Sequence, residues 1–183
     1  FDQTPIFGEV ADFHKLAELG DSEPGVLALF SDSTNVEREG YTLSEKVVGE
    51  TIDEIFRGAR ERIIVATFAS NIHRLHQIFK SAMKYDRKVA VTGRSMLNNV
   101  KIARKLGYIN IPDDMIVDIR DCSDMPDSNI VLLTTGSQGE PMAALTRMAR
   151  GDHYHINIKE GDSVVLSASA IPGNEKYIGQ TIN

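Results

Sequence analysis

The feature that most constrains the fold is a regular alternation between short apolar runs and longer amphipathic segments. The runs are bounded by Gly, Asp and Ser, as expected of strands that are buried on both faces. They are VLALF (26–30), RIIVATF (62–68), KVAVTG (88–93), IVLLTTG (130–136) and SVVLSAS (163–169). Several of the amphipathic segments end in Gly or a basic residue, which is typical of helix C-termini.

Apolar residues at helical spacing predict the helices between these runs. The predicted helices cover DFHKLAELG (12–20), SEKVVGETIDEIFRGAR (44–60), NIHRLHQIFKSAMKY (71–85), MLNNVKIARKLG (96–107) and PMAALTRMARG (141–151). One short edge strand is expected around Met115 to Ile119, in a segment rich in Pro, Asp and Ser. We therefore predict an α/β fold: a Rossmann-like, doubly wound, mainly parallel sheet of about five strands with helices on both faces.

Composition narrows the function. With 183 residues and 42% hydrophobic side chains, the chain can form a single globular unit. Its formal charge of -6 argues against nucleic-acid binding through a broad field of Lys and Arg, so any such binding requires a local groove. Clusters such as RGARER (57–62) and KIARK (101–105) are more simply solvated helix faces.

Other features bear on the setting of the protein. The chain contains no run of the ~20 apolar residues that a membrane helix needs. It opens at FDQTPIFGEV without an initiator methionine, so we expect a mature or excised piece of a longer polypeptide. The lone Cys122 cannot form an intrachain disulfide, which favours a reducing, cytoplasmic location.

Ligands of open parallel sheets collect beyond the carboxyl ends of the strands. The residues that follow the runs are small, hydroxylated or amide-bearing, as suits donors around an anion or a polar ligand. The stretch from Gly136 to Pro141 matches neither a dinucleotide fingerprint nor a P-loop, and a strand-to-helix turn that needs glycine explains it equally well. Asp32, at the end of the first run, could orient an imidazole or could only cap a turn.

Metal and nucleophile motifs are weak. His153 and His155 form an H-x-H pair, but nothing nearby completes a zinc site. His73 and His76 lie one helical turn apart without the intervening Glu of H-E-x-x-H. Cys122 lies in an acidic loop, which should raise the pKa of the thiol and suppress the thiolate. We therefore expect no metal site and no nucleophilic triad within this chain.

Taken together, several segments resemble the β-CASP domain of the metallo-β-lactamase-type ribonucleases, specifically bacterial ribonuclease J. They are SDSTN with EGYTLSE, RIIVATFASNIHRLHQIF, TGRSM, LTTGSQGEPMAALTRMA and SASAIPGNE. The resemblance covers essentially the whole chain, with the motifs in the family's order. FDQTPI also resembles the stretch that leaves the metallo-β-lactamase domain, so the resemblance implies a connecting segment and helix at 1–22 and a β-CASP domain at 23–183.

The resemblance implies roles for individual residues. Asp32 matches the acidic residue that stands at the active-site edge and supports a catalytic histidine. The residues that the resemblance implies for RNA binding are Ser33, Phe68, Ser70, Asn71, Arg94, Gly136, Ser137, Gln138, Gly139 and Glu140. A flat Phe68 side chain could stack on a base of any identity. On this resemblance, the glycine-bearing stretch is interpreted as a polar cradle.

The family's metal-binding H-x-H-x-D-H signature is absent, and its two later histidine motifs would lie beyond Asn183. The resemblance therefore implies a full-length, zinc-dependent exo- and endoribonuclease whose two zinc ions bind in a metallo-β-lactamase domain outside this chain. The isolated chain should be inactive. Implied partners are single-stranded RNA, that domain and further copies of the full-length protein, with no membrane. Two alternatives remain open: a self-contained Rossmann-like mononucleotide-binding module, and a non-catalytic interaction domain.

Overall fold

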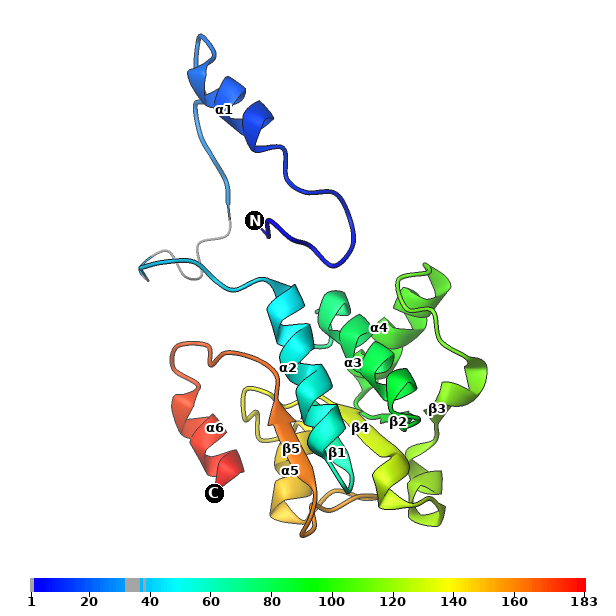
Figure 1. Cartoon of the computed structure of the whole chain (residues 1–183). Helices are drawn as coiled ribbons and strands as arrows, with labels where there is room; N and C mark the ends of the chain where they lie inside the picture. The colour runs from blue at the N-terminus through cyan, green and yellow to red at the C-terminus, as the bar shows by residue number, and fades with distance from the viewer. Residues whose placement is uncertain (1, 32–36, 38) are drawn as a thin grey trace. The chain divides into compact units, whose positions relative to one another are not determined.

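The computed structural model describes residues 2–31, 37 and 39–183, which fall into two compact units, Phe1–Val48 and Gly49–Asn183 (Figure 1). The helices are α1 (Phe13–Asp21), α2 (Glu45–Gly58), α3 (Ile72–Lys84), α4 (Arg94–Lys105), α5 (Ala144–Arg150) and α6 (Glu175–Ile182). The strands are β1 (Ile63–Ala66), β2 (Lys88–Val91), β3 (Ile116–Val117), β4 (Ile130–Thr134) and β5 (Ser163–Leu166). Three short 3-10 helices, η1 (Asp113–Met115), η2 (Ile119–Asp124) and η3 (Asp127–Asn129), connect β3 to its neighbours. No helix within these described ranges is long and apolar enough to span a membrane.

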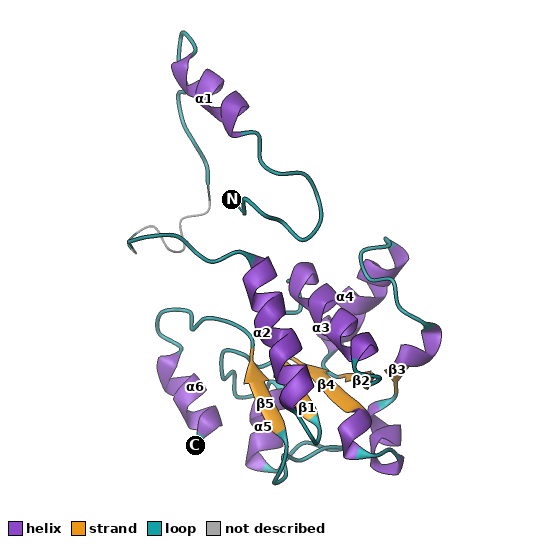
Figure 2. Cartoon of the chain, viewed as in Figure 1, coloured by secondary structure: helices purple, strands orange, loops and turns teal. Residues whose placement is uncertain are grey.

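The five strands form one parallel sheet in the order β3-β2-β4-β1-β5 (Figure 2). Ile63 of β1 is in register with Val131 of β4 on one side and with Ser163 of β5 on the other. All residues of β1 and β4 are buried, as expected of central strands covered on both faces. The predicted α/β fold with a five-stranded parallel sheet is confirmed.

Helices cover both faces of the sheet. On one face, Ile64 and Leu132 belong to a buried cluster with Leu145 and Met148 of α5. Successive side chains of a strand point to opposite faces, so the alternate strand residues face the other layer. The buried residues of α2, α3 and α4 do not belong to the α5 cluster, and Figure 1 shows α3 and α5 on opposite sides of the sheet. The chain therefore crosses from one face of the sheet to the other between α4 and α5.

The run at 26–30 is where the strand prediction is wrong. These residues form no strand, and Leu27 and Phe30 are 102% and 95% exposed. A strand needs a neighbour for its backbone hydrogen bonds, and none of the described residues of the Phe1–Val48 unit forms one. The fifth strand is instead β3, the edge strand predicted around Met115 to Ile119. Helix α6, which contacts α5, was not predicted because it is short and follows a Pro- and Gly-containing loop.

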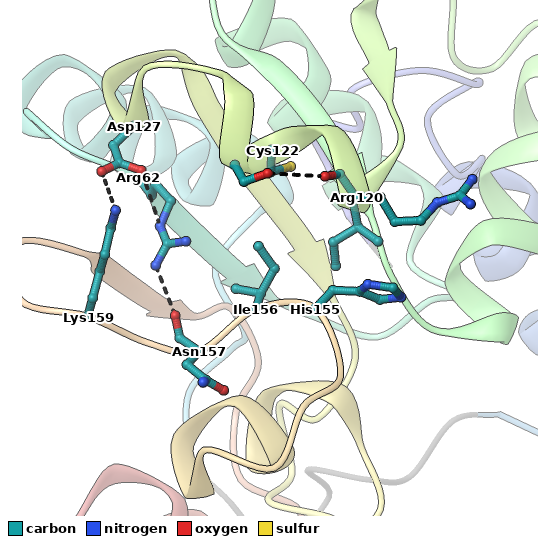
Figure 3. Close-up of a pocket in the computed structure, with 10 residues that line it drawn as sticks. Arg62, Arg120, Cys122, Asp127, His155, Ile156, Asn157 and Lys159 are labelled. Carbon is teal, nitrogen blue, oxygen red and sulfur yellow. Dashed lines mark hydrogen bonds and ion pairs between the residues drawn. The ribbon is translucent and has the colours of Figure 1, made fainter.

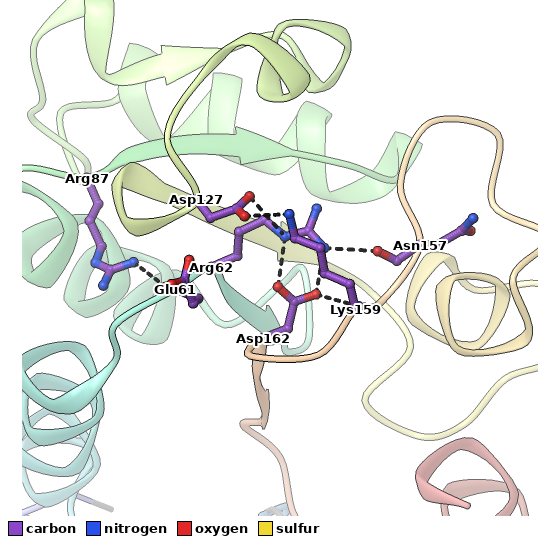
Figure 4. A network of polar contacts seen from close by, with 7 residues as sticks. All are labelled: Glu61, Arg62, Arg87, Asp127, Asn157, Lys159 and Asp162. Atoms are coloured by element: carbon purple, nitrogen blue, oxygen red, sulfur yellow. Dashed lines mark hydrogen bonds and ion pairs between the residues drawn. The ribbon is translucent and has the colours of Figure 1, made fainter.

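A network of charged side chains, centred on the buried Arg62 and Asp162, joins the segments that enter the sheet (Figure 4). Arg62, just before β1, donates from Nε and Nη2 to the carboxylate of Asp162, just before β5, at 2.8 and 2.6 Å. Lys159 bonds to Asp127, whose Oδ1 lies 3.8 Å from Arg62 Nε. Arg62 and Asp162 are buried, so their ion pair is costly to break: removing either partner leaves an uncompensated charge in the protein interior. The network therefore fixes the amino ends of β1, β4 and β5 relative to one another.

Cys122 lies at this same amino-end edge of the sheet. It lines a pocket of about 390 Å³ together with Arg62, Ile119, Arg120, Ser123, Asp127, His155, Ile156, Asn157 and Lys159 (Figure 3). The Cys122 side chain is nevertheless buried, and burial raises the pKa of its thiol to about 11. The neighbouring carboxylates of Asp121 and Asp118 add to the rise in pKa but are not its main cause. The raised pKa expected from the acidic loop is confirmed, with desolvation as the larger effect.

We predict that Cys122 in the folded chain does not react with iodoacetamide at pH 8, because the neutral thiol is not the nucleophile. The folded pKa of about 11 lies above the unfolded value of about 8.5. Stability contributed by the neutral thiol is therefore complete below about pH 8 and lost as the pH rises towards 11. Labelling of native and urea-unfolded protein, followed by mass spectrometry, measures this, and fast labelling of the native chain would contradict it.

Candidate functional site

The residues predicted to bind a ligand gather at the carboxyl ends of three neighbouring strands. Phe68 follows β1, Arg94 follows β2, and the loop at 136–140 follows β4. The backbone of the strands continues briefly beyond their ends, since Thr67 N bonds to Thr134 O at 3.2 Å. The β1 and β4 chains then leave towards helices on opposite faces, α3 and α5. Doubly wound sheets bind ligands where neighbouring strands diverge in this way, and we call this position at the carboxyl ends of β1 and β4 the crevice.

Phe68 is not a core residue. It is 37% exposed, although the residues that precede it in β1 and Thr67 are buried. The exposed Ser70 and the helix-capping Asn71 follow it. An aromatic ring that is exposed among polar groups at a ligand-binding edge is available for stacking.

Asn71 and Arg94 begin the two helices at this edge. Asn71 Oδ1 accepts a hydrogen bond from Arg74 N at 3.0 Å and so caps α3. Arg94 is exposed in the first turn of α4, directly after Gly93. Both side chains are therefore held near the crevice by the helix starts that follow buried strands.

The loop at 136–140 is a packed turn as well as a polar segment. Gly136 and Gly139 have φ of +105° and +71°, and a Cβ on Gly139 would lie 2.3 Å from the Tyr177 carbonyl carbon of α6. Gly136 is equally confined, since its Cβ would lie 2.9 Å from that of Ala143. Tight geometry and close packing explain both glycines. The structure therefore supports the interpretation that a strand-to-helix turn requires glycine at both positions.

Gln138 binds the neighbouring loop. Its side chain is buried, and Nε2 donates to Ser169 O at 3.0 Å while Oε1 accepts from Ile171 N at 2.8 Å. Ser137 is also buried, whereas Glu140 is exposed and its carboxylate accepts from Gln138 N at 3.2 Å. The Gln138 amide therefore holds the site together, and Glu140 is the member of this loop that faces solvent.

Three polar residues at this edge were missed by the sequence analysis. Thr67, Arg74 and Ser167 are buried, and the first two both bond to the third: Thr67 Oγ1 donates to Ser167 O at 3.0 Å, and Arg74 Nη1 donates to the same oxygen at 2.8 Å. The available signal was an arginine in the first turn of a helix that follows a central strand. Its partner Ser167 lies 93 residues away in the sequence, so the sequence did not reveal the pair.

Two predicted residues, Asp32 and Ser33, lie outside the described residues, and their assigned roles stay predictions. The histidines do not converge: His153 Nδ1 accepts from Ile156 N at 3.2 Å, and burial lowers the pKa of this imidazole. His76 Nδ1 lies 3.0 Å from Tyr108 O. Across residues 2–31, 37 and 39–183, no three His, Cys, Asp or Glu side chains form a group that could hold a metal ion.

The packing of Gly139 gives a prediction with an internal control. Gly139 and Gly151 have nearly the same φ, +71° and +74°, but a Cβ on Gly151 would meet nothing within 4 Å. Gly151→Ala should cost about 1 kcal/mol from backbone strain alone, whereas Gly139→Ala should cost about 1–3 kcal/mol more because the chain must move away from α6. Urea denaturation of both variants measures the difference, and equal losses would show that the contact with α6 does not constrain the loop.

The chain is similar in sequence to several known proteins. The chain is 51% identical over 182 residues to ribonuclease J of Synechocystis sp., 48% identical over 177 residues to ribonuclease J of Mycolicibacterium smegmatis, and 44% identical over 183 residues to ribonuclease J2 of Bacillus subtilis. These alignments cover 97–100% of this chain but only 28%, 31% and 33% of the respective relatives. The chain therefore spans about a third or less of the length of these curated relatives.

The sheet and its carboxyl-end crevice lie within the segment that a family description covers. Residues 60–183, from just before β1 to the end of the chain, match the family described as "Ribonuclease J, beta-CASP domain". The match includes Phe68, Arg94 and the loop at 136–140. Because it covers well over half of the sequence, the chain belongs to the ribonuclease J β-CASP domain family.

Proposed function

We propose that this chain is the RNA-clamping domain of a zinc-dependent ribonuclease of the ribonuclease J type, which degrades RNA as an exo- and endonuclease. The observation that carries the proposal is the exposed Phe68 ring at the crevice between β1 and β4, within a domain family named for a ribonuclease. Stacking on a phenyl ring accepts any base, as a degradative enzyme requires.

The charge distribution fits a local contact with RNA. With a formal charge of -6, the chain does not attract RNA over its whole surface. Arg94 is an exposed cation at the crevice, and Ser70 and Asn71 add neutral donors beside Phe68. The proposed contact therefore combines base stacking with a few hydrogen bonds and one charge. Tight binding of the RNA strand requires a second protein surface on its other side.

The described residues, 2–31, 37 and 39–183, do not fit a metal site, since they contain no suitable group of ligands. We therefore derive no metal-dependent step from it. In the proposal, the two zinc ions are bound by a metallo-β-lactamase domain of the same polypeptide, and this chain binds and orients the RNA strand beside them. A cytoplasmic location and self-association of the full-length protein are further parts of the proposal.

The mononucleotide-binding alternative has less support from the geometry. Such a module would use the loop at 136–140 as its phosphate cradle. In this loop Gln138 is buried and bonded to the 169–171 segment, and Gly139 packs against α6. The exposed side chain of the loop is the acidic Glu140, which would repel a phosphate group.

The first functional prediction separates stacking from packing at Phe68. In the full-length protein, Phe68→Ala should weaken binding of single-stranded RNA by about 1–3 kcal/mol, the usual contribution of one stacked base. Its denaturant midpoint should fall much less than that of a fully buried phenylalanine, because Phe68 is 37% exposed. Fluorescence anisotropy with labelled RNA and urea denaturation measure the two effects.

Phe79, which is 1% exposed on α3, is the matched control. Phe79→Ala should lose about 3–5 kcal/mol of stability while the folded fraction keeps its RNA affinity. If Phe68→Ala behaves like this control, Phe68 is a packing residue and the stacking role is wrong.

The second functional prediction concerns Asp32, whose role rests on the family resemblance. If Asp32 orients a catalytic histidine, Asp32→Asn in the full-length protein should lower kcat by orders of magnitude and leave RNA affinity and stability nearly unchanged. A residue that only caps a turn would instead lose about 1 kcal/mol of stability with kcat largely preserved. Single-turnover RNA cleavage together with thermal unfolding distinguishes the two results.

A further inference from the structure

Arg74 is a buried charge at the candidate site that the proposed function does not yet use. The residue is 8% exposed, although it lies in the first turn of α3, directly after the polar residues that follow β1. Its Nη1 donates to both the carbonyl oxygen and the hydroxyl of Ser167, at 2.8 and 2.5 Å. A buried donor that loses its partner costs free energy, so these two bonds make the contact between Arg74 and Ser167 hard to open. Their place at this edge of the sheet calls for an explanation.

The partner of Arg74 begins the segment that forms one side of the crevice. Ser167 follows β5 and is anchored by Thr67 Oγ1 and by its own N–H, which donates to Ala66 O at 2.8 Å. At the other end of the segment, Gln138 is bonded to Ser169 O and Ile171 N. Buried side chains from α3, from the end of β1 and from the loop after β4 thus hold the 167–171 segment at both ends.

The anchored segment lies beside Phe68. Ala66 and Leu166 are in register, so the residues after β5 run next to those after β1. Ser169 and Ala170 are exposed, whereas the Ser167 side chain that Arg74 holds is buried. Loss of the Arg74 bonds would therefore release one side of the crevice next to the ring proposed to stack on RNA.

We infer that Arg74 is a positioning residue for RNA binding: it holds the 167–171 segment against the end of β1. This inference rests on the proposed function. Single-stranded RNA is the ligand class, because the fixed segment keeps one side of the crevice next to Phe68, the ring proposed to stack on a base.

Arg87 provides a matched control at the opposite edge of the sheet. It is 4% exposed and donates to two backbone carbonyls, Glu61 O at 2.8 Å (Figure 4) and Ala59 O at 2.6 Å. Arg87 thus resembles Arg74 in burial and bonding but lies before β2, at the amino ends of the strands. Replacing either arginine by Met removes a buried guanidinium, and only Arg74 lies at the proposed RNA-binding edge.

The experiment compares Arg74→Met, Arg74→Lys and Arg87→Met in the full-length protein, with KM, kcat and the urea midpoint measured for a single-stranded RNA. Arg74→Met should raise KM by about tenfold with a smaller change in kcat. Arg74→Lys, which keeps the charge but not the planar fork, should recover part of the loss. Arg87→Met should lower the urea midpoint and leave KM unchanged, because unfolded molecules reduce the apparent kcat and not the affinity of the folded ones.

The outcomes separate the inference from the proposed function. If the wild-type protein neither binds nor cleaves RNA, the proposed function fails, and the inference fails with it. If the wild-type protein is active and Arg74→Met keeps the wild-type KM, Arg74 has only a structural role and the inference alone is overturned. If Arg74→Met does not fold, Arg74→Lys decides: a raised KM supports the positioning role, and an unchanged KM refutes it.

Discussion

The parallel pairing of β1 with β4 on one side and β5 on the other determines the rest of this structure. Because all three strands point the same way, the residues that follow them meet at one edge, and the ion pair between Arg62 and Asp162 sets the strand starts at the other. A strand reversed in direction would send its polar end to the wrong edge. The position of the candidate site therefore depends first on strand direction and only then on sequence motifs.

Buried polar side chains convert that edge into a defined surface. Gln138, Thr67 and Arg74 all bond to the segment after β5, and their burial means that these bonds are not exchanged for bonds to water. Because it has no Cβ, Gly139 allows the loop at 136–140 to approach α6 closely. A surface that is fixed in this way loses little conformational entropy when a ligand binds to it, which is the advantage of preorganisation.

Much of the fold could be predicted because its signals are local. The apolar runs of β1 and β4 and the periodicity of α3 each reflect a short segment that is buried in one conformation. The run at 26–30 is similarly apolar but has no strand partner among the described residues of its unit, and apolar residues alone do not supply one. The pKa of Cys122 shows a similar limit, since the acidic neighbours were visible in the sequence but the larger effect, burial, was not.

For the site, the sequence by itself determined the residue types at the strand ends, including Phe68 and the glycines of the loop at 136–140, and the family to which they belong. Only the tertiary structure decided what these residues do: Phe68 is exposed, Gln138 is turned inward, and Arg74 bonds to Ser167. The physical reason is that exposure and hydrogen bonding depend on segments far apart in the chain. Composition and spacing specify which groups reach the edge of the sheet, but packing across that edge decides which of them face a ligand.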